Sequence, residues 1–164
     1  AAAQRNIGSE GTSGRLWQPT VVRRFNGSAL QLRPPERASA RPVEGGGCDK
    51  WAVITTIFAP TKLVRQLVAL EDWCVVVVGD RKAQSEEQYV RALQLSESGR
   101  RRFTYLDEGA QRRLRFNIIE KLPWDHFGRK NVGFMYALER GANVVYDTDD
   151  DNELLDASSL SAWA

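Results

Sequence analysis

Two apolar runs rich in β-branched residues, separated by a helical pattern, constrain the fold of this chain most strongly. Residues 50–57 read KWAVITTI and residues 73–78 read WCVVVV, so a strand formed by either run would be apolar on both faces. Such strands are typical of a sheet that is covered by helices on both sides. Between the runs, apolar residues from Leu63 to Leu70 recur at helical spacing. A strand, a helix and a strand in this order predict a parallel sheet.

The same alternation continues toward the C-terminus. The further predicted elements are helices at residues 86–95 and 128–140 and strands at residues 103–106 and 143–146. The last of these helices stops before Gly141, a usual C-terminal cap, whereas residues 111–121 fit a helix and a strand equally well. We therefore predict an α/β fold with a mainly parallel sheet flanked by helices.

The composition changes near residue 50. Residues 1–49 hold 4 of the 6 prolines and 7 of the 13 glycines, which indicates a linker or stem that is largely disordered, and residues 50–164 form the predicted folded part. The chain begins with Ala rather than Met, so we expect a fragment of a longer protein. Its formal net charge of +2 argues against nucleic acid as a partner, and its apolar runs are too short to cross a membrane.

The two cysteines, Cys48 and Cys74, have no neighbouring histidine, which excludes a zinc site of the paired-cysteine kind. Because Cys74 lies in an apolar run, we expect a buried thiol rather than a disulfide partner. The triplet Asn26-Gly27-Ser28 fits an N-glycosylation acceptor and favours a secretory compartment, although such triplets are common by chance.

A dense cluster of carboxylates follows the last predicted strand. Its members are Asp147, Asp149, Asp150, Asp151 and Glu153. Like charges so close together repel one another, so a positive partner is expected, and Mg²⁺ or Mn²⁺ suits oxygen ligands at the carboxyl end of a strand. The alternative is a cap: Asp151 or Asn152 would begin a helix near Glu153 while the other acids are solvated.

Four further residues are candidates for ligand binding. Arg129 and Lys130 lie in the first turn of the predicted helix 128–140, where cations oppose the helix dipole unless an anion such as a phosphate docks there. Asp80 follows the second strand and is placed to bind a nucleobase or ribose, or simply to form a turn. His126, the single histidine, would orient a phosphate, act in acid–base chemistry or stabilise its loop. The run Arg100-Arg101-Arg102 is expected to be a solvated face.

Four segments together resemble a known family: KWAVITTI, WCVVVVGDRK, LPWDHFGRKN and GANVVYDTDDDNEL. They resemble the STELLO-type family of Golgi glycosyltransferases and, less closely, the reversibly glycosylated polypeptides, over about residues 50–154. The resemblance implies a GT-A-like, Rossmann-type fold, of which residues 50–164 would be the N-terminal nucleotide-sugar-binding part. It also implies that Asp149 and Asp151 are the DxD pair that joins Mn²⁺ or Mg²⁺ to the donor diphosphate, with Asp80 near the nucleoside and the basic pair Arg129 and Lys130 at the helix start.

The function implied by this resemblance is metal-dependent transfer of a glycosyl group from a nucleotide sugar, with a UDP-sugar favoured, to a glycan or protein acceptor. The implied location is the Golgi lumen, with a membrane anchor outside this chain and a complex with other transferases as a further expectation. The residues after Asp80, Arg81 to Gln84, depart from the Lys-Thr-Pro-like pattern that we would expect. Only 13 residues follow Asp151, so the acceptor-binding half and any catalytic base are missing, and we do not expect this fragment alone to turn over.

Three alternatives remain open at this point. The first is an inactive nucleotide-sugar-binding scaffold of the secretory pathway. The second is phosphoryl transfer through Asp147 as an aspartyl nucleophile. The third is a calcium site, because Asp147, Asp149 and Asp151 alternate as in the first half of an EF-hand loop, although Asn152 and Ser158 replace the glycine and glutamate of that loop.

Overall fold

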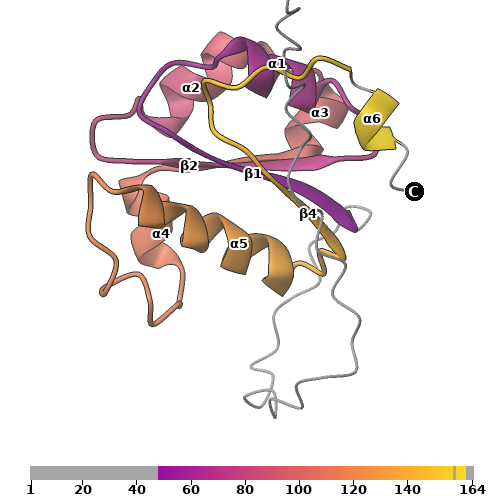
Figure 1. Cartoon of the computed structure of the whole chain (residues 1–164). Coiled ribbons are helices and arrows are strands. Elements are labelled where there is room, and N and C mark those ends of the chain that lie inside the picture. Colours follow the sequence, from indigo (N-terminus) through magenta and orange to yellow (C-terminus); the bar gives the residue numbers. More distant parts are fainter. Residues whose placement is uncertain (1–47, 157, 162–164) are drawn as a thin grey trace, which may run out of the picture.

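The computed structural model describes residues 48–156 and 158–161, and it shows a four-stranded sheet with helices on both faces (Figure 1). The strands are β1 (Lys50–Thr56), β2 (Cys74–Gly79), β3 (Phe103–Leu106) and β4 (Val144–Asp147). The helices are α1 (Lys62–Val68), α2 (Glu86–Leu93), α3 (Glu97–Arg102), α4 (Glu108–Arg113), the 3-10 turn η1 (Phe127–Arg129), α5 (Lys130–Glu139) and α6 (Ser158–Ser161). The predicted α/β fold is confirmed. The predicted linker and the Asn26 triplet lie outside the described residues, apart from Cys48 and Asp49.

All strand pairs are parallel, and the order across the sheet is β3-β2-β1-β4. The chain therefore builds outward from β1 to β3 on one side and then crosses back to place β4 on the other side of β1. In doubly wound sheets, ligands bind outside the carboxyl ends of the strands at the point where the order reverses. That point lies between β1 and β4.

The register places the ends of these strands at different positions along the strand direction. Thr56 at the end of β1 pairs with Gly79 at the end of β2, whereas Asp147 at the end of β4 pairs with Val53. The residues after Asp147 consequently run alongside the last residues of β1 before they leave the sheet. This arrangement brings the acidic cluster alongside Thr56.

Both faces of β1 are buried, as its sequence predicts. Ala52 and Ile54 face the layer of α1, α2 and α6, and Trp51 and Val53 face the layer of α5 (Figure 1). Helix α5 lies so close to the sheet that a Cβ on Gly133 would lie 2.6 Å from Val53 Cγ1. The sheet is thus a rigid central layer whose carboxyl edge carries the loops.

Several helix starts are fixed by hydroxyl or carboxylate caps. The caps, which accept backbone N–H groups, are Thr61, Ser85, Ser96 and Asp107. Helix α4 covers only the beginning of the ambiguous segment 111–121, and the rest has no helix or strand. Helix α5 ends at Glu139, and Gly141 follows with a φ of 87°, which confirms the predicted C-terminal stop.

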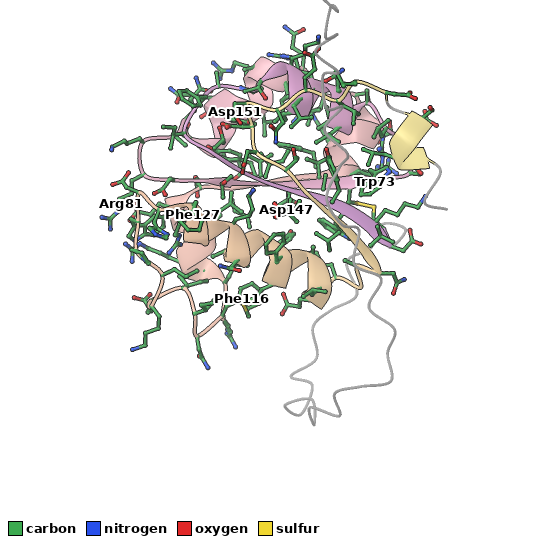
Figure 2. All side chains as sticks on the ribbon, viewed as in Figure 1. Trp73, Arg81, Phe116, Phe127, Asp147 and Asp151 are labelled. Carbon is green, nitrogen blue, oxygen red and sulfur yellow. A yellow bond between two sulfur atoms is a disulfide. The ribbon has the colours of Figure 1, made fainter. Side chains whose placement is uncertain are left out.

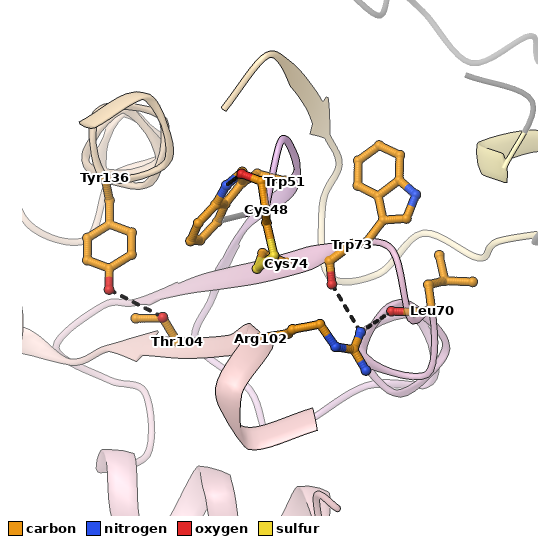
Figure 3. Close-up of a disulfide and its surroundings, with 8 residues drawn as sticks. All are labelled: Cys48, Trp51, Leu70, Trp73, Cys74, Arg102, Thr104 and Tyr136. Carbon is orange, nitrogen blue, oxygen red and sulfur yellow. Dashed lines mark hydrogen bonds between the residues drawn. A yellow bond between two sulfur atoms is a disulfide. The ribbon is translucent and has the colours of Figure 1, made fainter. Parts of the chain in front are cut away.

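The expectation for Cys74 is wrong, because Cys48 and Cys74 form a disulfide with a Cα–Cα distance of 5.9 Å (Figure 3). The physical reason is the parallel pairing of β1 with β2, which puts Trp51 opposite Cys74 and so brings the residues before β1 to the start of β2. Trp51 Nε1 donates to the Cys48 carbonyl at 3.0 Å and holds this entry segment in place.

Arg102 also differs from its expected role as a solvated cation. It is half-buried, and its guanidinium donates to the carbonyls of Leu70 and Trp73, which ties α3 to the turn before β2 (Figure 3). Within the described residues, no helix combines the length and apolar character needed to cross a membrane.

Candidate functional site

A cavity of about 280 Å³ opens at the carboxyl edge of the sheet. Its walls come from the end of β1 and the loop after it, from the end of β2, from the segment before α5, and from Asp150 after β4. The lining residues are Thr55, Thr56, Ile57, Val78, Asp80, Lys82, Asp125, His126, Phe127, Arg129 and Asp150. Figure 2 shows Arg81, Phe127 and Asp151 at this end of the molecule, with Trp73 toward the opposite end. The cavity therefore lies at the predicted ligand edge.

Asp80 joins two walls of the cavity. Its backbone N–H donates to the Thr56 carbonyl at 3.1 Å, which continues the β1–β2 pairing by one residue. Its carboxylate accepts backbone N–H groups from Arg81 at 2.7 Å, Asp125 at 3.0 Å and His126 at 3.3 Å. Asp80 thus anchors the segment before α5 to the end of β2, and its predicted contact with a nucleoside stays a prediction.

Arg129 lines the cavity but is almost completely buried, with 1% of its surface exposed. Its guanidinium donates to Gln111 Oε1, with Nη2 at 2.5 Å, and Nη1 donates to the carbonyls of Ile119 and Leu122 at 3.1 and 3.2 Å. Burial lowers the pKa of Arg129, and the Asp80 carboxylate opposes this shift. With its donors committed to the protein, Arg129 holds the loop in place and offers little to a phosphate.

Trp124 is the centre of the same loop and is surrounded by three guanidinium groups. Arg129 lies 3.7 Å from the centroid of the indole, Arg81 4.9 Å and Arg112 5.3 Å. Glu108 forms ion pairs with both Arg81 and Arg112, and the hydrogen bond from Arg112 lowers the pKa of Glu108. Cation–π contacts of this kind restrain the loop that carries His126.

Gln111 holds the site together, and the sequence analysis did not identify it. Its side chain is fully buried, and its amide nitrogen donates to the carbonyls of Gly79 at 2.6 Å and Leu106 at 2.8 Å, while its oxygen accepts from Arg129. The side chain therefore links the ends of β2 and β3 to the loop before α5. A polar residue in a segment without clear periodicity carries no local signal of such burial.

Lys130 supplies a positive charge to the acidic cluster. Its ammonium lies 2.8 Å from Asp147 Oδ1 and 2.5 Å from Asp149 Oδ1, and it donates to the Thr148 carbonyl at 3.0 Å. Burial alone would lower the pKa of Lys130, but the hydrogen bonds and charges of Asp147 and Asp149 outweigh burial and raise it. The structure therefore brings together the predicted residues Lys130 and Asp149, and it shows that the cluster is already partly neutralised.

Among the described residues, no cation pairs with Asp150 or Asp151. Asp150 accepts a hydrogen bond of 2.5 Å from Thr56 Oγ1, which ties the acidic segment to the cavity wall. Asp151 is exposed and has no hydrogen-bond or ion-pair partner among the described residues. The alternative of a helix capped near Glu153 is wrong, because that segment is not helical and α6 begins at Ser158.

Asp149 and Asp151 have the hard oxygen donors that Mg²⁺ and Mn²⁺ prefer. Within residues 48–156 and 158–161, no three or more His, Cys, Asp or Glu side chains are grouped so that they could hold a metal ion. A cation held by this pair would have to take its other ligands from a bound diphosphate and from water, as Mg²⁺ commonly does. Metal binding at these two residues stays a prediction.

The fold and the site define an α/β domain of the doubly wound type, with a cavity and a carboxylate pair beside its switch point. No protein-family model matches the chain. The chain is similar to two proteins of Arabidopsis thaliana, "Probable glycosyltransferase STELLO1" at 30% identity over 74% of this chain and "Probable glycosyltransferase STELLO2" at 32% identity over 66%. The resemblance to the STELLO-type family is thereby confirmed. The chain spans only 14% and 13% of the lengths of these two relatives.

Proposed function

We propose that this chain is the nucleotide-sugar-binding part of a glycosyltransferase that uses a UDP-sugar and Mn²⁺ or Mg²⁺. The observation that carries the proposal is the hydrogen bond between Thr56 and Asp150, which holds the carboxylate segment against the wall of the cavity. A nucleoside in the cavity would place its diphosphate beside Asp149 and Asp151. The names of the two relatives support a glycosyltransferase.

In the proposed reaction, the bond between the anomeric carbon and the diphosphate breaks and a bond to an acceptor oxygen forms. A cation bound at Asp149 and Asp151 would supply Lewis-acid stabilisation of the leaving diphosphate. Lys130 holds Asp149 in place and adds a fixed positive charge at the edge where negative charge develops. The acceptor proton passes to a base that residues outside this chain would supply, as they would supply the glycan or protein acceptor site.

The disulfide supports a location in the secretory pathway, because disulfides persist in oxidising compartments and are rare in the cytosol. We accordingly propose that the full protein works on the lumenal side of the Golgi. In that setting an anchor outside this chain and a complex with other transferases are parts of the same proposal.

The geometry favours this function over two of its rivals. Asp147, the nucleophile of the phosphotransfer alternative, is ion-paired with Lys130 and does not line the cavity. The calcium alternative needs Asp147, Asp149 and Asp151 on one ion, but among the described residues no three such side chains are grouped so that they could hold a metal ion. An inactive scaffold would bind the same donor without transferring the sugar.

Calorimetric titration of UDP into the 164-residue chain, with and without Mn²⁺, tests the proposal. We expect UDP to bind more tightly with Mn²⁺ and Asp151→Asn to remove that gain, since Asp151 has no partner among the described residues whose loss would disturb the fold. Glu153→Gln is the matched control, because it removes one nearby carboxylate charge whose ion-pair partner within the described residues is the exposed Lys62. Manganese dependence that survives in Asp151→Asn would refute the metal assignment, and absence of UDP binding under both conditions would refute the proposed function.

A further inference from the structure

His126 is held in one orientation by its neighbours. Its Nδ1 accepts the backbone N–H of Gly128 at 2.9 Å, its backbone N–H donates to Asp80, and its ring stacks on Phe127 with centroids 4.3 Å apart. A Cβ at Gly128 would lie 2.9 Å from Nδ1, so only glycine allows this close approach. Two contacts therefore fix the ring at the cavity wall, and the backbone bond to Asp80 fixes the residue that carries it.

The bond from Gly128 also determines where the imidazole proton resides. Nδ1 must present its lone pair to the Gly128 N–H, so a neutral ring carries its proton on Nε2. Nε2 has no hydrogen-bond partner among the described residues, although His126 lines the cavity. The site thus holds an oriented N–H donor without a partner among the described residues.

Asp80 offers a complementary acceptor next to this donor. A carboxylate has about four lone-pair positions, and three backbone N–H groups occupy three of them. One position on Asp80 remains for a ligand. His126 and Asp80 are joined by the hydrogen bond from the His126 backbone, so the donor and the acceptor have a fixed relative position.

The character of the cavity indicates which part of a nucleotide these groups meet. Carboxylates of Asp80, Asp125 and Asp150 line it, together with Lys82, which lies 3.5 Å from Asp125, and Arg129, whose guanidinium donates to protein acceptors. The acids outnumber the cations, so the lining disfavours a phosphate. The exposed side chains of Ile57 and Phe127, the latter 81% exposed, provide apolar surface suited to the flat face of a base.

We propose that His126 is a positioning residue whose Nε2–H donates to an oxygen of the nucleoside, a base carbonyl or a ribose hydroxyl, while Asp80 accepts from a neighbouring N–H or O–H. The inference rests on the proposed function and specifies the nucleoside subsite of that donor. His126 fixes the nucleoside and takes no part in bond breaking. Phe127 packs against the same group.

Two substitutions of His126 distinguish the role of Nδ1, which caps the Gly128 N–H, from the role of the Nε2–H donor. His126→Asn keeps an acceptor near the Nδ1 position, because asparagine caps helix starts well, but it removes the distal donor. His126→Gln reaches toward the Nε2 position with a carboxamide N–H while it gives up the cap. A purely structural role predicts that stability falls in the glutamine variant and that binding follows stability. The proposal predicts that binding follows the donor.

The experiment measures the affinity of the wild-type chain and both variants for UDP and for uridine, at one Mn²⁺ concentration, together with each variant's thermal midpoint. We expect His126→Asn to weaken UDP and uridine by the same factor, about tenfold, with an unchanged midpoint, and His126→Gln to recover most of the loss. Weakening of UDP but not of uridine would mean a phosphate contact and would overturn the inference, as would unchanged affinity in His126→Asn. If the wild-type chain binds neither compound, the proposed function itself fails. Long-range ¹H–¹⁵N NMR spectra of the imidazole provide an independent test, since a ring protonated on Nδ1 would also overturn the inference.

Discussion

Removal of the Cys48–Cys74 disulfide should destabilise the domain by an amount that can be worked out from its loop length. The two residues are 26 apart in sequence, and the chain-entropy relation for a loop of that length gives about 3.5 kcal/mol at 25 °C. Native domains of this size have a total stability of about 5–15 kcal/mol, so the effect is a large fraction of the whole. With a urea m-value of about 2 kcal/mol/M, the unfolding midpoint should fall by nearly 2 M.

The assay is urea unfolding followed by tryptophan fluorescence, in the presence and absence of a reductant. The double variant Cys48→Ala with Cys74→Ala should unfold at the midpoint of the reduced wild type, and the reductant should have no further effect on it. The hydrogen bond from Trp51 goes to the backbone of Cys48, so the variant keeps it. Titration of two free thiols in the untreated native protein, or an unchanged midpoint after reduction, would refute the reasoning.

Three further substitutions test the core. Gly133→Ala should destabilise the domain by about 1–3 kcal/mol in the same urea assay, because its Cβ would lie 2.6 Å from Val53 Cγ1 and 2.9 Å from Val78 Cγ2; an unchanged midpoint would contradict this packing. Tyr89→Phe should leave the free energy of unfolding unchanged or raise it by about 1 kcal/mol, since the Tyr89 hydroxyl is buried and has no partner among the described residues. Tyr105→Phe should lower the free energy of unfolding by about 1 kcal/mol, because it loses the 2.8 Å hydrogen bond to the Gln84 carbonyl. Burial raises the pKa of both tyrosines above the ordinary 10.0, so their neutral forms contribute stability that is complete below pH 10 and is lost as the pH rises above it; each phenylalanine variant should lose less stability between pH 9 and 11.

The strands and helices that carry long apolar patterns were predictable from the sequence. Lys50–Thr56 and Cys74–Gly79 differ from the predicted strands by one residue at the ends, and Phe103–Leu106 matches its prediction. Runs that are apolar on both faces permit burial in only a few ways, so periodicity and length decide the structure. The carboxyl edge of the sheet, and with it the general position of the site, followed from the same argument.

The partners within the site were not predictable, because they lie far apart in sequence. Lys130 meets Asp147 and Asp149 only after α5 returns the chain to β4, beside β1. The sequence identified these residue types as candidates, but it could not show that the lysine neutralises the acids. The disulfide escaped prediction for the same reason, since strand pairing and not sequence proximity brings Cys48 to Cys74.

Arg129 shows a further limit of inference from position alone. A cation at the start of a helix suggests a site for an anion. The structure instead buries Arg129 between Gln111 and Trp124. Burial of a guanidinium requires several acceptors from different segments, and no local pattern records them. Sequence motifs therefore located the loop, and tertiary contacts decided which partners its side chains bind.

The measurement that tests the central claim most directly is paramagnetic broadening of backbone amide signals by Mn²⁺ in the ¹H–¹⁵N NMR spectrum of the chain, with and without UDP. The account predicts that UDP makes low concentrations of Mn²⁺ broaden the signals of Asp149 to Asn152 and of Thr56 first, and that Asp151→Asn abolishes this effect. Broadening that is uniform, that is centred on other residues, or that does not depend on UDP would contradict a nucleotide-coupled metal site at the end of β4.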